Sequence, residues 1–546
     1  SMAITDENAF ELPKLRSSFS LENDTEFLEN DNVAEFFDVK FCPYQPLDAQ
    51  PVFAAISKKH VSRPSACSTL TERVLTRAQV VICTLSQTAD NNPCEVLSVI
   101  RDDDVGIAKC ALPAHCDPVT GAPYLCIGGV DAKVKIYDVV NGKLYRCLTG
   151  HGGDVNDLAT SPADPSIIAS ASGDTSIRVW SLDPVHANRP CLVILAGEGH
   201  SWDLLSLAFH DTGRYILSAG HDQIINLWTL PDLPTEAITT PVRVHYPHFS
   251  TSAVHSGIID CVAFYGDYIL SRACHDNVIS LWRIEGFSSA NPPPPQSMAP
   301  TAQTTVPTNY DEASRLTRSA FVPTMSPQCP SQYTMLLQFH TPNCGPQFFM
   351  RFKLHFVPDQ HPVLAFCNAG GNVFFWDFER LLAYREFMEM LKDPNKDRSK
   401  PVPHPSWMRL VKGRPPKTDS NKGRNAGADK DIPSAFRADA IRLSEEIGDY
   451  NAETLETWAS RYSQEDPHEP LKAHKTESSS ANFVGRQAAW SPGGEWCVVV
   501  GSSNQALILQ RWANKGSTSR ASASASASAS APPSAPPSAP IQNGTS

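Results

Sequence analysis

The chain has 546 residues, of which 41% are hydrophobic, and a formal net charge of −12 at pH 7. No uncharged apolar run approaches the ~20 residues of a membrane-spanning helix, so the sequence predicts no membrane partner and no helical membrane protein. The acidic balance argues against broad binding of a phosphate backbone and favours a basic partner. The 15 Cys residues form no C-x-x-C pair, which is typical of buried thiols in the cytosol or nucleus.

The beginning of the chain is polar. Residues 1–25 show few strand signals and are predicted to form a disordered tail. In ENDNVAEFFDVKF, which starts at Glu29, Phe37, Val39 and Phe41 alternate with other positions and predict a strand. This strand is taken as the first of a domain that spans residues 26–514.

A recurring pattern follows in the middle of the chain. It reads SASGDTSIRVW at residues 170–180, SAGHDQIINLW at 218–228 and SRACHDNVISLW at 271–282, with a weaker copy, GGVDAKVKIYD, at 128–138. Each copy places a turn Asp between two strand-like runs, and the aromatic residues that end the copies lie 43, 48 and 54 residues apart. An upstream His, an Asp turn and a Trp at a period of about 40–45 residues form the WD40 signature of a β-propeller blade.

The repeated His and Asp residues resemble a catalytic or metal-binding set, but we expect a structural role. In each repeat the His, a strand Ser, the turn Asp and the indole N–H can link in a buried hydrogen-bond chain. The sequence also contains no G-x-S-x-G, H-E-x-x-H or P-loop motif. No catalytic residue, metal site or cofactor is therefore predicted.

Strand-like runs between Phe37 and Trp512 group into seven units. The predicted fold is thus an all-β, seven-bladed WD40 β-propeller with two long loop insertions. The outer strands of blades four and five are expected at residues 242–249 and 333–339, and blade six is expected to begin with a strand over residues 348–356.

The last blade lacks a strand of its own. Residues 515–546 form a Ser/Ala/Pro tail that is predicted to be disordered. Blade seven then has three strands and an open edge, and a segment within about residues 20–33 is expected to supply the fourth strand.

Two insertions interrupt the predicted propeller. Residues 287–331 are Pro-rich, which disfavours strand and helix alike. Residues 380–466 begin and end with helical spacing, with Ser434 and Asn451 as candidate N-caps. Between these helical parts, residues 392–430 carry 11 Lys and Arg against 4 Asp and Glu, which predicts either a solvated linker or a surface for DNA or an acidic partner.

Four stretches differ from the repeat consensus. They are EFFDVKF near Phe37, VHYPHFSTSAVHSGIIDCVAFYGDYILS at residues 244–271, FFMRF at 348–352 and VGRQ at 484–487. All four resemble the embryonic ectoderm development (extra sex combs) family, the WD40 subunit of Polycomb repressive complex 2. The resemblance covers about residues 30–514, without the two insertions and the tails.

The resemblance implies a non-catalytic nuclear protein that reads a histone mark. In the family, an aromatic cage on one face of the propeller binds trimethyllysine of the histone H3 tail. The other face holds a helix of the enhancer-of-zeste methyltransferase, which the occupied cage stimulates, and a suppressor-of-zeste subunit is a further implied partner. Independently of the resemblance, the charge of residues 392–430 suits contact with nucleosomal DNA or an acidic partner. A quaternary ammonium cannot donate a hydrogen bond, so aromatic faces recognise it, at about 0.5–2 kcal/mol per ring.

Matching the motifs implies a cage made of Phe37, Phe348 and Phe349. The fourth cage position, a Tyr in the family, falls at Ala108, so one wall is missing unless Tyr124 or an insertion residue closes it. The preference between trimethyllysine and dimethyllysine stays open. The alternative is that Phe348 and Phe349 only pack blade six, because adjacent residues of a strand point to opposite faces.

Three further residues match positions along the peptide path of the family. They are Asn156, Asp260 and Arg351.

Two other function classes remain open. One is a WD40 adaptor without methyllysine recognition, such as a ubiquitin-ligase substrate receptor, a class that commonly adds a helical module before the propeller. About 30 residues precede the propeller here, which counts against that reading. The other is an enzyme built on a propeller, since fold alone fixes no function.

Overall fold

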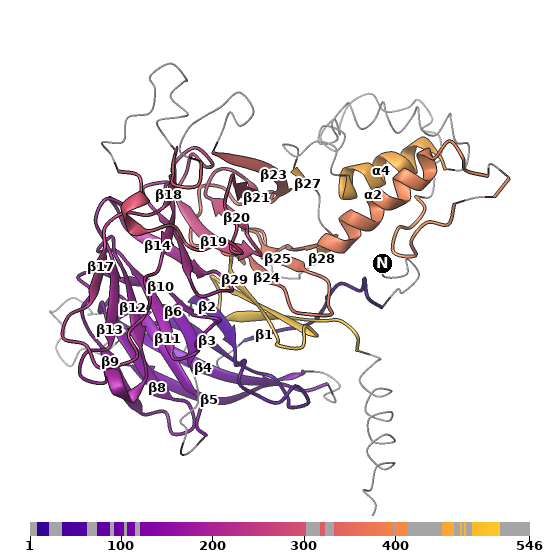
Figure 1. Cartoon of the computed structure of the whole chain (residues 1–546). Helices are drawn as coiled ribbons and strands as arrows, with labels where there is room; N and C mark the ends of the chain where they lie inside the picture. The colour runs from indigo at the N-terminus through magenta and orange to yellow at the C-terminus, as the bar shows by residue number, and fades with distance from the viewer. Residues whose placement is uncertain are drawn as a thin grey trace, which may run out of the picture.

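A computed structural model describes residues 8–20, 35–62, 74–87, 92–102, 106–114, 119, 121–301, 317–322, 332–397, 399–400, 402–411, 450–463, 470–471, 474–476 and 483–513. Within these ranges the chain forms seven sheets of four or five strands, mainly antiparallel, two α-helices and two short 3-10 helices (Figure 1). The first strands of blades one to five contact one another in order, as do those of blades six and seven, and the first strand of blade seven contacts that of blade one. Blades five and six are joined by the hydrogen bond from Met350 N to Asp260. The predicted seven-bladed propeller is confirmed.

The strands of the first four blades are as follows. Blade one contains β2 (Glu35–Phe41), β3 (Val52–Ser62), β4 (Val74–Leu85) and β5 (Cys94–Asp102). Blade two contains β6 (Ala108–Ala114), β7 (Tyr124–Gly129), β8 (Val134–Asp138) and β9 (Leu144–Leu148). Blade three contains β10 (Val155–Thr160), β11 (Ile167–Ser172), β12 (Ile177–Ser181), β13 (Cys191–Leu195) and β17 (Val242–Val244), and blade four contains β14 (Leu204–Phe209), β15 (Tyr215–Gly220), β16 (Ile225–Thr229), β18 (Phe249–Thr251) and β22 (Thr317–Ser319).

The remaining three blades complete the ring. Blade five contains β19 (Ile259–Tyr265), β20 (Tyr268–Ala273), β21 (Val278–Ile284), β23 (Tyr333–His340) and β27 (Pro470–Leu471). Blade six contains β24 (Lys353–His355), β25 (Val363–Cys367), β26 (Val373–Asp377) and β28 (His474–Thr476). Blade seven contains β29 (Gly485–Trp490), β30 (Trp496–Gly501), β31 (Gln505–Gln510) and β1 (Lys14–Ser20), and the 3-10 helices are η2 (Pro184–His186) and η3 (Gln296–Met298).

The repeat motif forms a buried hydrogen-bond chain in blades three, four and five, as predicted. In blade four the Trp228 indole donates to Ser218 Oγ at 2.9 Å, and the Ser218 hydroxyl lies 2.6 Å from His200 Nε2. His200 Nδ1 lies 2.9 Å from Asp222 Oδ2. The same contacts recur at 2.6–2.9 Å through Ser170, His151, Asp174 and Trp180, and through Ser271, His255, Asp276 and Trp282.

The ring is closed by a strand from the beginning of the chain. β1 pairs antiparallel with β31, so blade seven receives its fourth strand from residues 14–20. The segment expected to do this, residues 20–33, was placed too late, and the predicted disordered tail over residues 1–25 is wrong where β1 lies. Residues 1–7 and 21–34 lie outside the described residues. Phe10 anchors this segment because its ring is buried. The centroid of this ring lies 4.6 Å from that of the His361 ring and 5.4 Å from that of the Trp407 ring.

Several outer strands differ from the predicted ones. Residues 242–249 do not form one strand of blade four: β17 joins blade three in parallel with β13, and β18 becomes the fourth strand of blade four. The predicted outer strand of blade five is confirmed as β23. Within the Pro-rich insertion, β22 adds a fifth strand to blade four, and this is possible because its sequence, TRS, contains no Pro.

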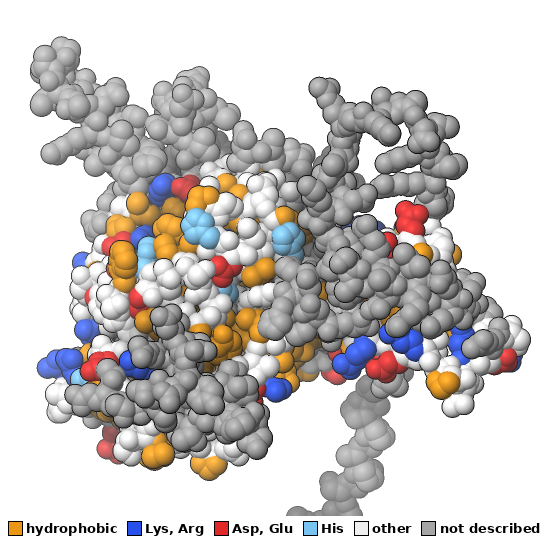
Figure 2. All heavy atoms as spheres, turned by 90° about the horizontal axis from the view of Figure 1, so that it is seen from above, with side chains coloured by type: hydrophobic (Ala, Val, Ile, Leu, Met, Phe, Trp, Pro, Cys, Tyr) orange, Lys and Arg blue, Asp and Glu red, His pale blue; other side chains and the backbone are white. Residues whose placement is uncertain are grey.

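The second insertion contributes two helices beside the propeller (Figure 1). α2 (Phe378–Lys392) is capped by Asp377, and α4 (Ala452–Tyr462) is capped by Asn451, whose side chain accepts from Thr454 N at 2.7 Å as predicted. Their aromatic side chains join the core of blades five and six. Seen at right angles, Lys and Arg lie interspersed with Asp and Glu on this part of the surface (Figure 2). The predicted N-cap Ser434 and the tail over residues 515–546 lie outside the described residues.

Two classes of feature are absent from the part of the chain that the structure describes. No group of three or more His, Cys, Asp or Glu is placed to hold a metal ion. No described helix is long and apolar enough to cross a membrane.

The role of β1 can be tested by deletion. Removing residues 8–20 should expose the edge of β31 and empty the site of Phe10. We expect a loss of at least the about 3–5 kcal/mol that one large aromatic core side chain contributes, measured by urea unfolding. Deleting residues 515–546 is the control and should leave the unfolding midpoint unchanged. An unchanged midpoint on deletion of residues 8–20 would show that the ring does not need β1.

The carboxylate in the buried hydrogen-bond chain of blade four predicts that the stability of the fold depends on pH. Burial by itself raises the pKa of Asp222, but the hydrogen bond from His200 and backbone N–H donors outweigh it and lower the pKa below the usual value. Because the folded-state pKa is lowered, the carboxylate stabilises the fold above about pH 4, and this contribution is lost as the pH falls further. We expect Asp222→Asn to reduce the free energy of unfolding by about 1–3 kcal/mol at pH 7.

The measurement is urea unfolding of Asp222→Asn and the wild type between pH 7 and pH 3. The difference between the two proteins should shrink below about pH 4. Asp232→Asn changes a carboxylate of the same region whose side chain is 92% exposed, and serves as the matched control. A difference that stays constant over this range would mean that the charge of Asp222 does not contribute.

Candidate functional site

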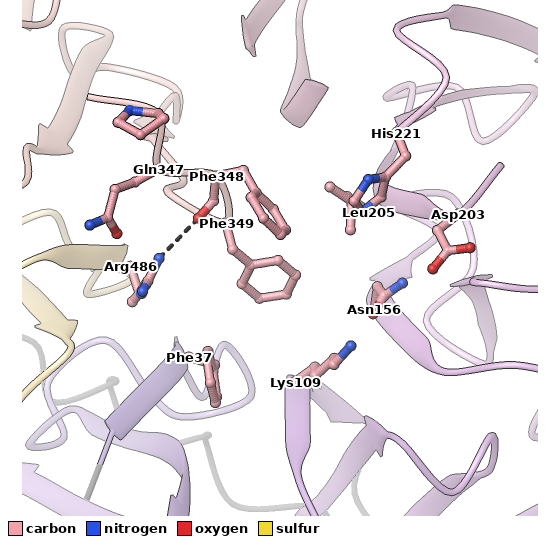
Figure 3. Close-up of a pocket in the computed structure, with 11 residues that line it drawn as sticks. Phe37, Lys109, Asn156, Asp203, Leu205, His221, Gln347, Phe348, Phe349 and Arg486 are labelled. Atoms are coloured by element: carbon pink, nitrogen blue, oxygen red, sulfur yellow. Dashed lines mark hydrogen bonds between the residues drawn. The ribbon is translucent and has the colours of Figure 1, made fainter. Parts of the chain in front are cut away.

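A pocket of about 510 Å³ opens where the first strands of the blades converge. Its lining comes from blades one, two, three, four, six and seven, so it lies at one end of the propeller axis. Figure 3 shows the residues around it. They are Phe37, Lys109, Asn156, Asp203, Leu205, His221, Pro346, Gln347, Phe348, Phe349 and Arg486.

Many of these residues share one structural origin, a β-bulge near the start of a first strand. In six of the seven blades, the pairing of the first strand with the second skips one residue. A bulge leaves this extra residue unpaired and re-aims its side chain. Five of the six skipped residues line the pocket, namely Phe37, Lys109, Asn156, Leu205 and Arg486. The sixth, Asp260, does not.

The structure brings the three predicted phenylalanines together on this pocket (Figure 3). The rings of Phe37 and Phe349 meet edge to face, with centroids 6.0 Å apart and planes at 89°. Phe349 is 8% exposed and Phe348 is 39% exposed, so one ring forms the inner wall and the other forms the rim. An aromatic cavity of this kind can hold a cation without donating or accepting hydrogen bonds.

The backbone at Phe349 explains how two neighbouring rings reach one pocket. The expected strand over residues 348–356 is wrong for its first part, because β24 contains only Lys353–His355. Phe349 instead has φ of +63°, a left-handed conformation. This breaks the alternation of a strand, in which Phe348 and Phe349 would point to opposite faces. The alternative that both rings only pack blade six does not fit the exposure of Phe348.

Arg351 forms the support beneath the cage. Its guanidinium lies 4.4 Å from the centroid of the Phe349 ring. It donates to Asn156 O at 2.8 Å and to Leu205 O at 3.3 Å, and it lies 3.3 Å from Asp157 Oδ1. Burial would lower the pKa of Arg351, but nearby carboxylates, chiefly Asp157, outweigh this and raise the pKa. A charged Arg351 therefore joins blade six to blades three and four across the axis.

Of the three residues predicted along the peptide path, only Asn156 lines the pocket. Arg351 is 4% exposed, and Asp260 is fully buried. Asp260 forms an ion pair with Arg272 and accepts from Met350 N at 3.0 Å. Arg351 and Asp260 are thus placed to hold the loop that carries Phe348 and Phe349, and they do not form the pocket surface.

The fourth wall of the cage is not aromatic. Ala108 is fully buried in the core between blades one and two, and the bulge presents the next residue, Lys109, to the pocket. Lys109 Nζ lies 2.8 Å from Asp154 Oδ2, so its charge is paired. Tyr124 does not close the gap, because it lines a different pocket and stacks on Tyr145 at 4.5 Å. The pocket lining therefore contains three phenylalanines, and Lys109 stands where a fourth aromatic ring was considered.

Several residues of the site were missed by the sequence analysis, among them His221 and Arg486. His221 lies 5.3 Å from Phe348, ring to ring, and its position next to the turn Asp of a repeat was the available signal. Arg486 donates to Phe348 O at 2.9 Å and pairs with Glu35 at 3.2 Å, which fixes the rim. The lining combines three phenylalanine rings with a lysine and an arginine that each form an ion pair.

Comparison with known proteins gives the family. The WD domain, G-beta repeat family matches residues 142–181 and 190–229. Polycomb protein EED of Chaetomium thermophilum is 45% identical over 94% of this chain and 98% of that protein. Polycomb protein esc of Drosophila melanogaster is 32% identical over 31% of this chain and 42% of that protein.

Solved structures give the same result. A chain in the crystal structure of the polycomb repressive complex 2 of C. thermophilum matches with a TM-score of 0.75 and 47% identity, covering 92% of this chain and 98% of that chain. A chain in the structure of the same complex with H3K27me3 matches with a TM-score of 0.75 and 46% identity, covering 93% of this chain and 99% of that chain. From its sequence and its fold, the chain belongs to the Polycomb EED (extra sex combs) family of WD40 propellers.

Proposed function

We propose that this protein is a non-catalytic subunit of a nuclear polycomb repressive complex 2. It binds trimethyllysine of the histone H3 tail in the cage of Phe37, Phe348 and Phe349. It also scaffolds an enhancer-of-zeste methyltransferase, together with a suppressor-of-zeste subunit, and stimulates the methyltransferase when the cage is occupied.

One observation carries the proposal. Three phenylalanines from two blades that are distant in sequence line a single pocket on the propeller axis. A core residue needs no such placement, and Phe348 is exposed enough to meet a ligand. The net charge of −12 complements a basic histone tail, and a relative at 46% identity occurs in a complex with H3K27me3.

The absence of a fourth aromatic ring from the pocket lining sets the expected affinity for the trimethylated peptide. Each aromatic face contributes about 0.5–2 kcal/mol to the binding of an ammonium group. A cage with three rings instead of four should therefore bind about 2- to 30-fold more weakly, while it keeps its preference for the methylated form. Arg351 and Asp260 contribute to binding by holding the loop that carries Phe348 and Phe349 in position.

The cage can be tested by calorimetric titration of H3-tail peptides, trimethylated and unmodified. The wild type should prefer the trimethylated peptide several-fold, and Phe349→Ala and Phe37→Ala should remove the preference, because each deletes a ring face. Phe37→Ala is included because Phe349 is largely buried and its variant can lose stability.

Phe356→Ala is the matched control. Phe356 follows the same loop, is 49% exposed and contacts Tyr265 rather than the pocket. This variant should bind like the wild type. A wild type that does not distinguish the two peptides would reject the reader function and leave a scaffold.

Stimulation is tested separately in the reconstituted complex. Adding the trimethylated peptide should raise the rate of histone methylation by the wild-type complex several-fold. With Phe37→Ala the basal rate should stay unchanged and the rise should disappear, because only peptide binding is lost. A rise that persists in this variant would place the stimulating site elsewhere.

The proposed contact of residues 392–430 with nucleosomal DNA stays a prediction. Residues 412–449 lie outside the described residues. In the described part of the run, Lys392, Lys396 and Lys400 alternate with Asp393 and Asp397 along the sequence.

A further inference from the structure

Most of the first strands carry small side chains at one level of the propeller axis. This level lies three positions after the bulged residue of each strand, about 10 Å along the strand from the pocket. Ala159, Ala208 and Ala263 are only partly buried there, although they lie on the innermost strands. The residues at this position in the six bulged strands are Lys40, Leu112, Ala159, Ala208, Ala263 and Ala489. Four alanines among six residues leave space around the axis.

Lys353 of blade six belongs to the same part of the ring. It is the first residue of β24 and lies two positions after Arg351, whose side chain reaches blade three across the axis. The Lys353 side chain is exposed, although the adjacent Phe352 is buried.

The surroundings of Lys353 show that its side chain faces the axis. Desolvation by the surrounding blades lowers the pKa of Lys353, and the charge of Lys40 lowers it further. The other groups that act on its charge lie on the first strands of blades one, three and five, and they are Asp38, Asp157 and Cys261. An exposed ammonium with neighbours on three other blades lies inside the ring and not on its outer surface.

The charges around the axis are paired except that of Lys353. Three buried carboxylates form ion pairs there, and the pairs are Asp38 with Lys40, Asp157 with Arg351, and Asp260 with Arg272. Within the described ranges, Lys353 Nζ forms no hydrogen bond and no ion pair. The axis therefore carries one uncompensated positive charge, and a charge enclosed by protein is costly without a counterion.

We propose that the axis holds a small monovalent anion, such as chloride, against the ammonium of Lys353 at the level of the alanines. One negative charge balances the one unpaired cation, whereas a dianion such as phosphate would leave a net negative charge inside the ring. The short alanine side chains provide the space for the ion. The site is separate from the cage, and the proposal does not rest on the proposed function.

The anion would bind only the closed ring. Lys353 comes from blade six and Lys40 from blade one, so the positive groups meet only in the folded chain. We expect a dissociation constant for chloride on the order of 10 mM, which corresponds to one hydrogen bond to a charged group. Chloride should therefore stabilise the fold as its concentration rises through this range.

The test is ³⁵Cl NMR of the full-length chain, because chloride that exchanges with a protein site has a broadened resonance. Bromide should reverse the broadening at similar concentrations, and phosphate at the same ionic strength should not. Lys353→Met keeps the length of the side chain without its charge and should weaken chloride binding about tenfold or more. Lys353→Arg keeps the charge and should retain most of the binding. A crystal soaked in bromide should show an anomalous scatterer beside Lys353 Nζ.

Lys133→Met is the matched control. It removes an exposed lysine from the turn between β7 and β8, and it should leave the broadening unchanged. Circular dichroism melting checks that each variant keeps the fold. Chloride binding that is equal in Lys353→Met and the wild type would overturn the proposal, and so would an absence of broadening in the wild type, which would mean that Lys353 is neutral in the folded chain. Displacement of chloride by phosphate as readily as by bromide would overturn the assignment to a monovalent anion.

Discussion

The arrangement of the site depends on side chains that join neighbouring blades near the axis. Asp38 accepts from Ala111 N at 2.9 Å, Asp157 accepts from Leu207 N at 2.9 Å, and Asp260 accepts from Met350 N at 3.0 Å. A buried carboxylate is costly unless it is paired, and Lys40, Arg351 and Arg272 provide the opposite charges. These links fix the relative positions of blades that form separate sheets.

The same links place the binding residues. The bulged residues Phe37 and Asn156 each lie one position before a bridging carboxylate, and Phe349 lies one position before the Met350 amide that Asp260 holds. A bulge turns one side chain towards the axis, while the next residue fixes the strand to the adjacent blade. The pocket thus follows from how the ring is held together, and the loop between β23 and β24 adds Phe348 and Phe349 to it.

The fold could be predicted because its signals are local and repeated. The Asp turn and Trp of each repeat identify a blade, and the four side chains that form the buried chain in blade four are readable from their spacing. The closing strand could not be placed, because seven residues such as KLRSSFS become a strand only against the free edge of β31. The division of residues 242–249 between two blades likewise depends on neighbours distant in sequence.

The residues of the candidate site divide in the same way. Local motifs identify some of them, and others depend on contacts between residues distant in sequence. Family motifs identified Phe37, Phe348 and Phe349, which all line the pocket. They did not identify Asp203 or His221, which lie in turns whose side chains meet the pocket only after the ring closes. Nor did a strand pattern foresee that Phe349 adopts a left-handed conformation.

The wall of the pocket that lacks an aromatic ring carries a charged residue, Lys109. A lysine facing a cage would repel a bound ammonium, and such repulsion in a partly buried site is comparable to the attraction of one or two rings. Asp154, 2.8 Å from Lys109, offsets this repulsion. Glu35 is shared by Arg486 at 3.2 Å and Lys58 at 3.0 Å, and Asp203 adds a further carboxylate to the pocket lining. On the proposed function, three rings are enough to bind the ammonium group because these carboxylates offset the three cations around the pocket.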